Sequence, residues 1–484
     1  MNEQRPSSMG DMSAEEFRRH GHRLVDWIAD YLDGIERYPV LSLAAPGDIV
    51  RALPPAAPDT GEPFDDVLAD VDRVLMPGVT HWNHPGFMAY FGITGSAPGI
   101  FADFLASALN QQAMLWRTSP VATELEEVAL GWLRALIGLP AAFEGIIYDT
   151  ASVSSLHALA AAREAAVPQA RAKGIAGRAD VPRLRVYCSE QAHSSIDKGI
   201  MLLGLGHEAL CKIPVDAAFR MRPEALAAAV AADRAAGRLP IAVVATAGTT
   251  STTSVDPVDA VADVCAAERL WLHVDAAYAG VCAMLPELRS RFAGIERADS
   301  LVVNPHKWLF TPFDLSAFYC RRGDVLRQAF SLTPEYLRTT DAARNLSDTG
   351  VQLGRRFRAL KLWMILRYFG AEGVRARLRE HIRLAQMLAG WIDAHPDFER
   401  LAPTPFSVVC FRARPAGRAL SEAELDALNE ALLNAVNASG DVFLSHTKLD
   451  GRFTLRVAIG NIRTRETHVR RVWELLQEGL GGRD

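Results

Sequence analysis

Lys307 has the clearest potential for chemistry in this sequence. It lies in the run NPHKW (304–308), directly after an apolar run and between His306 and Trp308. A lysine held beside apolar and aromatic groups has a lowered pKa, which frees its amine to form an imine with an aldehyde. The ordinary alternative is a surface lysine whose stem packs on the protein while its amine stays in water.

A carboxylate ends another apolar run, because Asp275 lies in HVDAAYAG (273–280) with small residues after it. A buried carboxylate is costly unless it meets a cation or several hydrogen bonds. The protonated ring nitrogen of pyridoxal phosphate is such a cation, and the ion pair would let the ring accept electrons from a substrate. A strand-end aspartate that caps a helix is the alternative. About one strand–helix–strand unit separates Asp275 from Lys307, so both could reach neighbouring strand ends.

Hydroxyl residues open a predicted Ala-rich helix in DTASVSSLHALAAARE (149–164), where Thr150, Ser152, Ser154 and Ser155 cluster. Free backbone N–H groups at a helix N-terminus, together with hydroxyls, suit a phosphate. An ordinary Ser/Thr cap is the alternative. The cluster is therefore a candidate phosphate cup.

Two further polar residues follow predicted strands. His193, in YCSEQAHSSIDKG (187–199), could stack on a flat ring or transfer a proton, and a loop histidine without a role is the alternative. Thr250, in GTTST (248–252), adds a hydroxyl at another strand end. Each signal is weak alone, but their order and strand-end context together favour a pyridoxal phosphate site.

The elements that would position these residues alternate along the middle of the chain. Alternating strands and helices predict an α/β fold, with a mostly parallel sheet covered by helices on both faces. Functional side chains gather at the carboxyl ends of strands in such sheets. The predicted strands are 184–188, 241–246, 270–275, 300–304 and 315–320, and the predicted helices include 156–166, 222–236 and 257–268.

The two ends of the chain have a different pattern. Residues 13–35 predict an amphipathic helix, with Ser13 and Glu16 at capping-box spacing. After about residue 355 a long helical stretch leads into another helix, and a small α+β domain follows. Its predicted strands are 406–412 and 453–459, and its predicted helix is 421–437. We expect an N-terminal helical segment at 1–95, a large cofactor-binding domain at 96–370 and a small domain at 371–484.

Composition excludes several classes of protein. The 484 residues carry a net charge of -5, so nucleic-acid binding is not expected. No signal peptide and no membrane helix is evident, and the six cysteines are scattered without a CxxC pair. We therefore expect a cytoplasmic protein with reduced thiols. A metal site is not expected either, because His81 and His84 have no clearly associated third ligand.

At this point the motifs together resemble a known family. The chain resembles the group II pyridoxal-phosphate-dependent amino acid decarboxylases, most closely the aromatic-L-amino-acid (dopa/tryptophan) decarboxylases. The likeness extends from VTHW (79–82) through YCSEQAHSS, HVDAAYAG and NPHKW to LGRRFRALKLW (353–363). The resemblance implies the aspartate aminotransferase type I fold, pyridoxal 5'-phosphate as cofactor and α-decarboxylation of an L-amino acid. It also implies a homodimer with active sites at the interface, in which the N-terminal helix packs on the partner.

The resemblance assigns roles to matching positions. It implies that Lys307 forms the Schiff base, that Asp275 pairs with the pyridinium, and that His193 and Ala277 flank the ring. The implied phosphate region is Thr150, Ala151, Ser152, Asn304 and His306; Thr250 lines the site; and Trp82, Tyr90 and Phe91 form the aromatic substrate pocket. Gly354 leaves room for an indole at a position where some phenol-selective relatives have serine.

Tyr336, in TPEYLRT, matches the tyrosine implicated in protonating the substrate carbon after carbon dioxide leaves. In related aldehyde synthases phenylalanine typically replaces it, so Tyr336 together with His193 favours simple decarboxylation. Some positions depart from the family. Asp149 replaces a glycine before the phosphate cup, Gly92 and Ile93 replace Pro-Thr, and Gln112 and Met114 replace an apolar residue and a phenylalanine of the animal members.

Three alternatives remain open on the sequence. The first is a decarboxylase of another amino acid, such as histidine, glutamate or a sulfinate, although the aromatic run argues against small acidic substrates. The second is an aromatic aldehyde synthase, which couples decarboxylation to oxidative deamination. The third, from a different class, is a non-catalytic pyridoxal-phosphate-binding regulator, although no basic recognition segment is evident.

Overall fold

The N-terminal region is helical and projects from the rest of the chain. The computed structural model describes residues 10–332 and 344–481, so Tyr336 lies outside the described residues. Helix α1 (Ala14–Asp33) begins with the predicted capping box, in which Ser13 accepts from the Glu16 amide and Glu16 accepts from the Ser13 amide. His20 is the one buried residue of this helix. Two short helices follow, α2 (Asp48–Ala52) and α3 (Phe64–Asp70).

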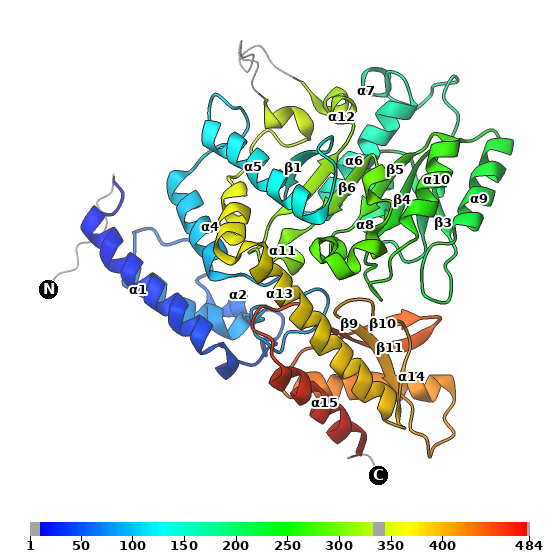
Figure 1. The fold of residues 1–484 in the computed structure, drawn as a ribbon. Coiled ribbons are helices and arrows are strands. Elements are labelled where there is room, and N and C mark those ends of the chain that lie inside the picture. Colours follow the sequence, from blue (N-terminus) through cyan, green and yellow to red (C-terminus); the bar gives the residue numbers. More distant parts are fainter. Residues whose placement is uncertain (1–9, 333–343, 482–484) are drawn as a thin grey trace.

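A seven-stranded sheet forms the centre of the molecule (Figure 1). Its strands, in spatial order, are β1 (Glu144–Tyr148), β7 (Ser316–Cys320), β6 (Ser300–Val303), β5 (Trp271–Asp275), β4 (Leu239–Thr246), β2 (Leu184–Ser189) and β3 (Leu210–Ile213). Strand β7 pairs antiparallel with both β1 and β6, while β2 to β6 pair in parallel. All strands except β7 therefore point the same way, and their carboxyl ends share one edge.

Helices cover both faces of this sheet, as the alternating pattern predicts. On strand β4, Val243 and Ala245 face one apolar core while Ala242 and Val244 face the other. The first core includes α5 (Pro120–Ile137), α9 (Pro223–Ala235) and α10 (Val258–Glu268). The second includes α6 (Ala151–Ala166), α8 (Ser195–Leu202) and α12 (Gly323–Phe330). The predicted α/β fold class is confirmed.

A smaller sheet forms a second layered unit below the first in Figure 1. Helix α13 (Ala359–Ala394) leads into it and bends at Gly370, whose φ is 63°. The antiparallel strands, in spatial order, are β10 (Ser445–Leu449), β11 (Arg452–Ala458), β9 (Val408–Ala413) and β8 (Phe398–Arg400). They pack against α14 (Glu422–Ala438) and α15 (Glu466–Gly481). The small α+β region is confirmed, whereas the numerical domain boundaries remain a prediction.

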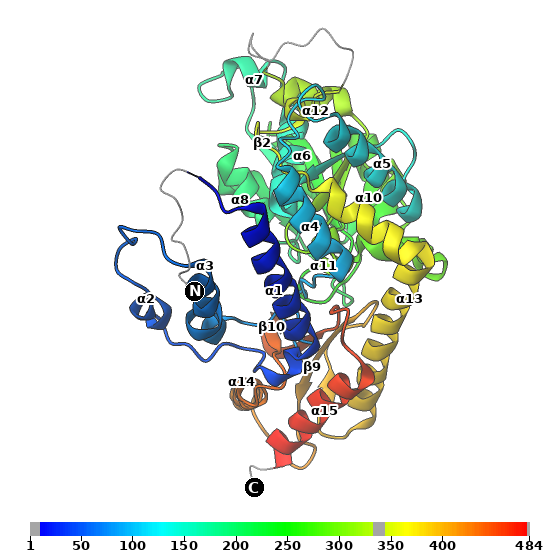
Figure 2. The ribbon, with the colours of Figure 1, turned by 90° about the vertical axis from the view of Figure 1, so that its left-hand side faces the viewer.

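The segment that carries the predicted aromatic pocket joins this smaller sheet. The Met88 amide donates to Phe443 O at 2.9 Å, and the Ala458 amide donates to Met88 O at 2.8 Å. Figure 2 shows α1 running beside α4 (Ala97–Leu109), which follows this segment in sequence. Among the described residues, no helix is long and apolar enough to cross a membrane.

Candidate active site

A cavity of about 430 Å³ lies where the carboxyl edge of the large sheet meets strands β10 and β11. It brings together most of the predicted site residues, although they come from distant parts of the chain. The predicted residues that line it are Trp82, Tyr90, Phe91, Thr150, Ala151, Ser152, His193, Thr250, Asp275, Ala277, Asn304, His306 and Lys307. The strand directions explain this convergence, because residues that follow β1, β2, β4, β5 and β6 all reach one edge.

Lys307 lies in the short helix α11 (Pro305–Trp308), which directly follows strand β6. Its Nζ atom lies 5.4 Å from the centroid of the Phe91 ring. Removal from bulk water lowers the pKa of the Lys307 amine, whereas the nearby Asp275 carboxylate raises it and Arg456 lowers it. An amine with a lowered pKa has a larger unprotonated fraction near neutral pH, and this is the form that attacks an aldehyde.

Asp275 is the last residue of β5 and is 6% exposed. Its Oδ1 atom accepts from the Ala277 amide at 3.1 Å. Among the described residues, no arginine, lysine or histidine forms an ion pair with this carboxylate within 4.0 Å. A buried anion that lacks a close cation is suited to a positively charged ligand.

The His193 ring is oriented by its own loop. The Ser195 amide donates to His193 Nδ1 at 3.1 Å, and the Ser195 hydroxyl lies 2.8 Å from the same atom. Burial lowers the pKa of His193. Since Nδ1 accepts a backbone hydrogen bond, the proton of the neutral ring belongs on Nε2. The ring is therefore held in one tautomer beside Asp275.

The phosphate cup lies at the start of α6. Thr150 precedes this 16-residue helix, and Ala151 and Ser152 form its first turn, where backbone N–H groups are free. Asn304, which follows β6, is 2% exposed, and its Oδ1 atom has no hydrogen-bond partner among the described residues. The cavity thus offers unpaired polar groups to a ligand.

His306 has a structural contact of its own. Its Nδ1 atom accepts from the Leu315 amide at 2.9 Å, which ties α11 to the start of β7. Burial and the adjacent Lys307 lower the pKa of His306 to about 3, so the ring is neutral. A neutral histidine in this place helps to hold Lys307 in position without adding charge.

These groups fit pyridoxal phosphate. The molecule carries an aldehyde, a ring nitrogen that can be protonated, and a phosphate. The cavity presents an amine of lowered pKa, a buried carboxylate and a helix N-terminus, one for each of these groups. The unpartnered Asn304 oxygen adds a further polar contact. The individual residue roles stay predictions.

Aromatic residues line part of the cavity. Phe91 stacks on Tyr278 with ring centroids 3.7 Å apart, and Tyr278 stacks on Trp308 at 4.7 Å. Trp82 and Tyr90 lie further along the same wall, with centroids 6.1 Å apart. This wall is apolar and flat, which suits a planar side chain.

Arg456 is a cavity residue that the sequence reasoning missed. It lies on β11, is 3% exposed, and its guanidinium lies 4.7 Å from the Phe91 centroid. It donates to Ser251 O at 3.0 Å and also to Tyr90 O. A single arginine inside the apolar run FTLRVAI was the available signal. Tyr278, Phe313, Ser445, His446 and Thr447 also line the cavity and were not predicted.

Gly354 lies outside this cavity. An added Cβ would lie 3.9 Å from Gln112 Nε2, and Gln112 Oε1 accepts from the adjacent Arg355 amide at 3.0 Å. Gly354 is thus a neighbour of Gln112, one of the positions that differ from the family. The proposed role of Gly354 in the substrate site stays a prediction.

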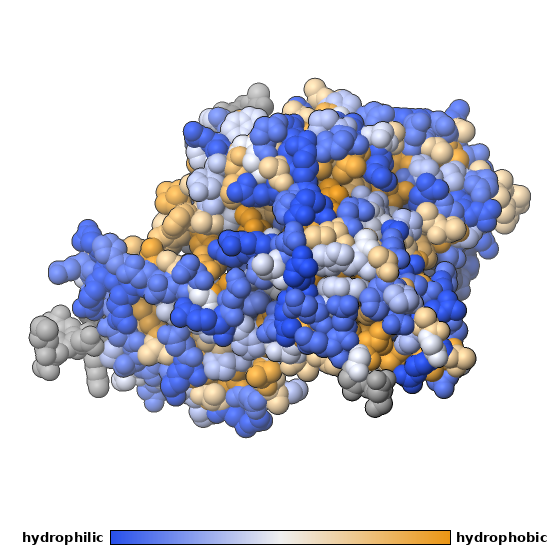
Figure 3. Space-filling view, turned by 60° about the horizontal axis from the view of Figure 1, so that its bottom comes forward, coloured by the Kyte–Doolittle hydropathy of each residue, from blue (hydrophilic) through white to orange (hydrophobic). Residues whose placement is uncertain are grey.

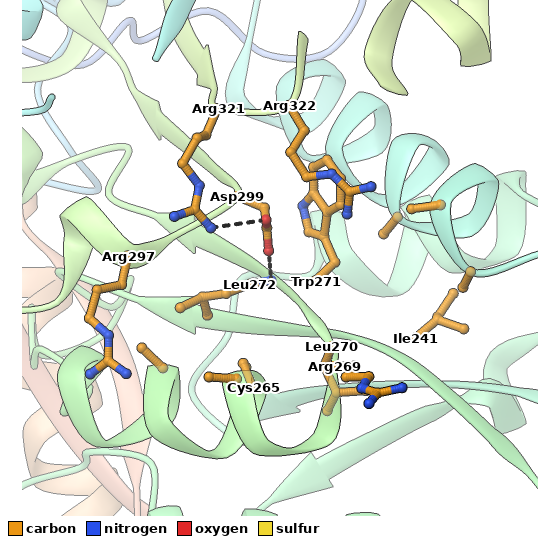
Figure 4. Close-up of a pocket in the computed structure, with 15 residues that line it drawn as sticks. Ile241, Cys265, Arg269, Leu270, Trp271, Leu272, Arg297, Asp299, Arg321 and Arg322 are labelled. Atoms are coloured by element: carbon orange, nitrogen blue, oxygen red, sulfur yellow. Dashed lines mark hydrogen bonds and ion pairs between the residues drawn. The ribbon is translucent and has the colours of Figure 1, made fainter. Parts of the chain in front are cut away.

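A second hollow of about 420 Å³ lies at the opposite edge of the sheet (Figure 4). Arg321 pairs with Asp299 at 3.2 Å, and Arg322 lies over the Trp271 ring at 5.4 Å. Arg269 follows the end of α10, where a cation offsets the helix dipole. No lysine or histidine is present among its described lining residues, so this hollow lacks the amine that imine chemistry needs.

Comparisons with known proteins agree with this chemistry. Residues 46–414 match the pyridoxal-dependent decarboxylase conserved domain. The chain is 40% identical over 479 residues to phenylacetaldehyde synthase of Arabidopsis thaliana, covering 96% of each protein. It is 40% identical over 477 residues to aromatic-L-amino-acid decarboxylase of Sus scrofa, again covering 96% of each.

A solved structure is also closely similar. The structure of Oryza sativa TDC with PLP and tryptamine superposes with a TM-score of 0.94 and 37% identity, covering 98% of this chain and 99% of that one. The predicted family and the cofactor are thereby confirmed. The chain belongs to the pyridoxal-dependent decarboxylases, enzymes that use pyridoxal phosphate to remove a carboxylate as carbon dioxide.

Proposed function

We propose that this enzyme decarboxylates an aromatic L-amino acid, of the tryptophan, dopa, tyrosine or phenylalanine type, to the amine and carbon dioxide. The observation that carries the proposal is one cavity in which Lys307 and Asp275 lie together with the aromatic rings of Trp82, Tyr90 and Phe91. The names of the similar proteins support an aromatic substrate.

Bound pyridoxal phosphate supplies an aldehyde to the protein and an electron-accepting ring to the substrate. The Lys307 amine would hold the cofactor through that aldehyde. Asp275 would hold positive charge at the ring nitrogen, which would favour loss of carbon dioxide. His193 and Ala277 would restrict the orientation of the ring, and the amides at the start of α6 would hold the phosphate.

Two residues are proposed to take part in transferring a proton to the α-carbon in place of the lost carbon dioxide. The protonated Nε2 of His193 lies in the cavity and can donate a hydrogen bond. Tyr336 is proposed to deliver the proton to the α-carbon, on the basis of its match to the family motif. The aromatic wall of Trp82, Tyr90 and Phe91 would exclude water and orient a flat side chain.

The direct test is Lys307→Ala, with Lys173→Ala on an exposed helix as the matched control. The Lys307 variant should lose the visible absorbance of bound cofactor and all turnover, because no other amine takes its role. The control should keep both. Wild-type turnover in Lys307→Ala would reject the assignment. A panel of amino acids, with the amine identified by mass spectrometry, would name the substrate.

An aldehyde synthase is the second candidate, because one similar protein is named phenylacetaldehyde synthase. That reaction consumes oxygen and water and releases aldehyde, carbon dioxide, ammonia and hydrogen peroxide. We expect amine as the main product of the wild type, and aldehyde with peroxide from Tyr336→Phe. Unchanged amine output from this variant would remove Tyr336 from the mechanism. Stoichiometric peroxide from the wild type would establish the synthase instead.

Two further alternatives are resolved by the same assays. Turnover of histidine, glutamate or a sulfinate amino acid, without turnover of aromatic substrates, would replace the proposed specificity. Cofactor binding without turnover of any amino acid would favour a non-catalytic regulator. The aromatic wall supports the first proposal over both.

We also propose that the enzyme is a homodimer with active sites at the interface. In support, α1 and α4 together line an apolar groove of about 210 Å³, made of Gly21, Leu24, Val25, Ile28, Ala29, Leu32, Ala97, Ile100, Phe101 and Phe104. Phe101 is 53% exposed in the single chain. Figure 3 shows apolar patches near the projecting N-terminal region. Contiguous exposed apolar surface of this kind marks an interaction site.

A cytoplasmic location is proposed from the thiols. All six cysteines are free, and most are buried. Reduced cysteines are typical of the cytosol. Fractionation of cells that express the protein would test this location, and recovery with secreted proteins would contradict it.

A further inference from the structure

The stretch of chain that follows residue 343 docks against the end of strand β1 and the neighbouring helix α6. We name residues 349–352 the return segment. Tyr148 donates its hydroxyl hydrogen to Thr349 O, and the Val351 amide donates to His157 Nε2 at 3.0 Å. The two aromatic rings stack with centroids 4.3 Å apart, so they form one platform for the return segment.

Gly350 lets the return segment lie close to this platform. A Cβ added at Gly350 would lie 3.0 Å from Tyr148 Cε1 and 3.1 Å from His157 Nε2. Burial lowers the pKa of His157 to about 4, so its ring is neutral and Nε2 can accept the Val351 hydrogen bond. The return segment therefore docks through close packing at Gly350 and through the hydrogen bond from Val351 to His157.

Asp149 connects the return segment to the phosphate cup. Its Oδ2 atom accepts from Gln352 Nε2 at 3.2 Å. Its Oδ1 atom accepts from the Thr150 amide at 2.6 Å and lies 3.3 Å from the Thr150 hydroxyl. Thr150 itself lines the cofactor cavity. One carboxylate thus bonds the first residue of the cup and the last residue of the return segment.

We propose that Asp149 is a positioning residue that couples cofactor binding in the phosphate cup to docking of the return segment. The proposal rests on the proposed function. A phosphate in the cup fixes Thr150, and Thr150 fixes the carboxylate that receives the Gln352 hydrogen bond. Coupling of this kind is reciprocal, so a docked return segment raises the affinity for the cofactor by the same factor.

The return segment follows, in sequence, the stretch that contains Tyr336. Relatives with glycine at position 149 have no side chain to make either contact, so this device is a property of chains with an acidic residue here.

The test is hydrogen–deuterium exchange of peptides covering residues 345–353, measured on the full chain with and without pyridoxal phosphate. In the wild type, cofactor should slow exchange about five- to tenfold, at the lower end of common coupling strengths. In Asp149→Gly and Gln352→Leu, the factor by which cofactor slows exchange should fall to about one. Both should raise the cofactor dissociation constant of the apoprotein by a similar factor.

Two controls separate coupling from simple damage. Asp149→Asn should retain the protection, because its Oδ1 can accept from the Thr150 amide while Gln352 rotates its amide to present an oxygen. Gln328→Leu, on an exposed part of α12, should behave as the wild type. Melting temperatures of all variants would report any general loss of folding.

The outcomes are distinct. Wild-type cofactor protection in Asp149→Gly or Gln352→Leu, or no protection at 345–353 in a wild type that binds cofactor, would overturn the coupling. A wild type that never acquires cofactor absorbance would reject the proposed function itself. Loss of protection in Asp149→Asn equal to that in Asp149→Gly would show that the hydrogen-bond geometry is not the cause.

Discussion

The reactivity of Lys307 depends on opposing influences from its neighbours. Burial and Arg456 lower the pKa of its amine, while Asp275 raises it. The unprotonated amine is the form that reacts with an aldehyde, so the cofactor should be incorporated at a lower pH than an ordinary lysine, of pKa 10.5, would allow.

Asp275→Asn should shift the pH dependence of cofactor incorporation to lower pH. Removing the carboxylate removes the influence that raises the pKa of Lys307, so the midpoint for cofactor incorporation moves to lower pH. Arg456→Gln should move the midpoint the other way, because it removes an influence that lowers the same pKa. Stopped-flow absorbance of apoprotein mixed with pyridoxal phosphate at a series of pH values measures both shifts. An unchanged midpoint in both variants would contradict the electrostatic account.

The same Asp275→Asn substitution should reduce kcat by roughly 10²–10³-fold, the usual cost of losing one preorganised electrostatic contact. The physical reason is that a neutral amide cannot stabilise positive charge on the ring nitrogen. Steady-state kinetics at saturating cofactor measures the loss. Asp263→Asn, on an exposed carboxylate, is the control and should leave kcat unchanged. Equal activity of the two variants would remove Asp275 from the mechanism.

Sequence reasoning located Lys307, Asp275 and His193 because each follows an apolar run that forms a strand ending at the cavity. It missed Arg456, although a charged residue inside an apolar strand was visible. The contact between Arg456 and Tyr90 spans 366 positions, and nothing in the local pattern pairs them. Gly354 was assigned through resemblance alone, and in the single chain it lies beside Gln112 instead of the cavity.

At the scale of elements, one buried ion pair joins α5, β1 and the segment before α13. Arg355 and Glu126 are 2.7 Å apart, with side chains 5% and 3% exposed. Glu126 also accepts from the Ile147 amide, and Arg355 donates to Ile147 O and Ala113 O. These contacts satisfy both charges in a place that water does not reach.

Glu126→Gln should lower the free energy of unfolding by about 3–5 kcal/mol, because it leaves the buried guanidinium without its counter-charge. Urea denaturation followed by circular dichroism measures the change. Glu287→Gln breaks the exposed pair with Arg379, whose side chains are 49% and 45% exposed, and should cost less than about 1 kcal/mol. Similar costs for the two substitutions would contradict this account of the buried pair.

The element pattern was largely predictable, and its departures have local causes. The predicted strands 184–188 and 241–246 correspond to β2 and β4, because short, mostly apolar runs are typical of strands that are covered on both faces. The reversed direction of β7 was not predicted, since an apolar run carries no information on strand direction. The two helices expected after residue 355 are present, because α13 consists of two helical stretches separated by a kink at Gly370, whose backbone is not helical.

At the scale of the molecule, the apolar surface of α1 and α4 predicts how copies of the chain associate. Phe101→Glu places a charge in the apolar groove and should convert the proposed dimer to monomer, with loss of activity. Light scattering coupled to size-exclusion chromatography measures the mass. Leu202→Glu, at a residue that is 75% exposed on α8, is the control and should not change the mass. A wild type that is monomeric yet active would contradict the proposed interface.

The hydrogen bonds that join Met88 to Phe443 and Ala458 have a consequence for truncated forms of this enzyme. They hold the aromatic segment at residues 82–91 against the smaller sheet, so this part of the cavity needs both early and late sequence. A fragment spanning residues 96–370 would keep the lysine and the carboxylate but would lack any surface to select an amino acid. The cavity is therefore complete only when residues 443–458 have folded onto the segment around Met88.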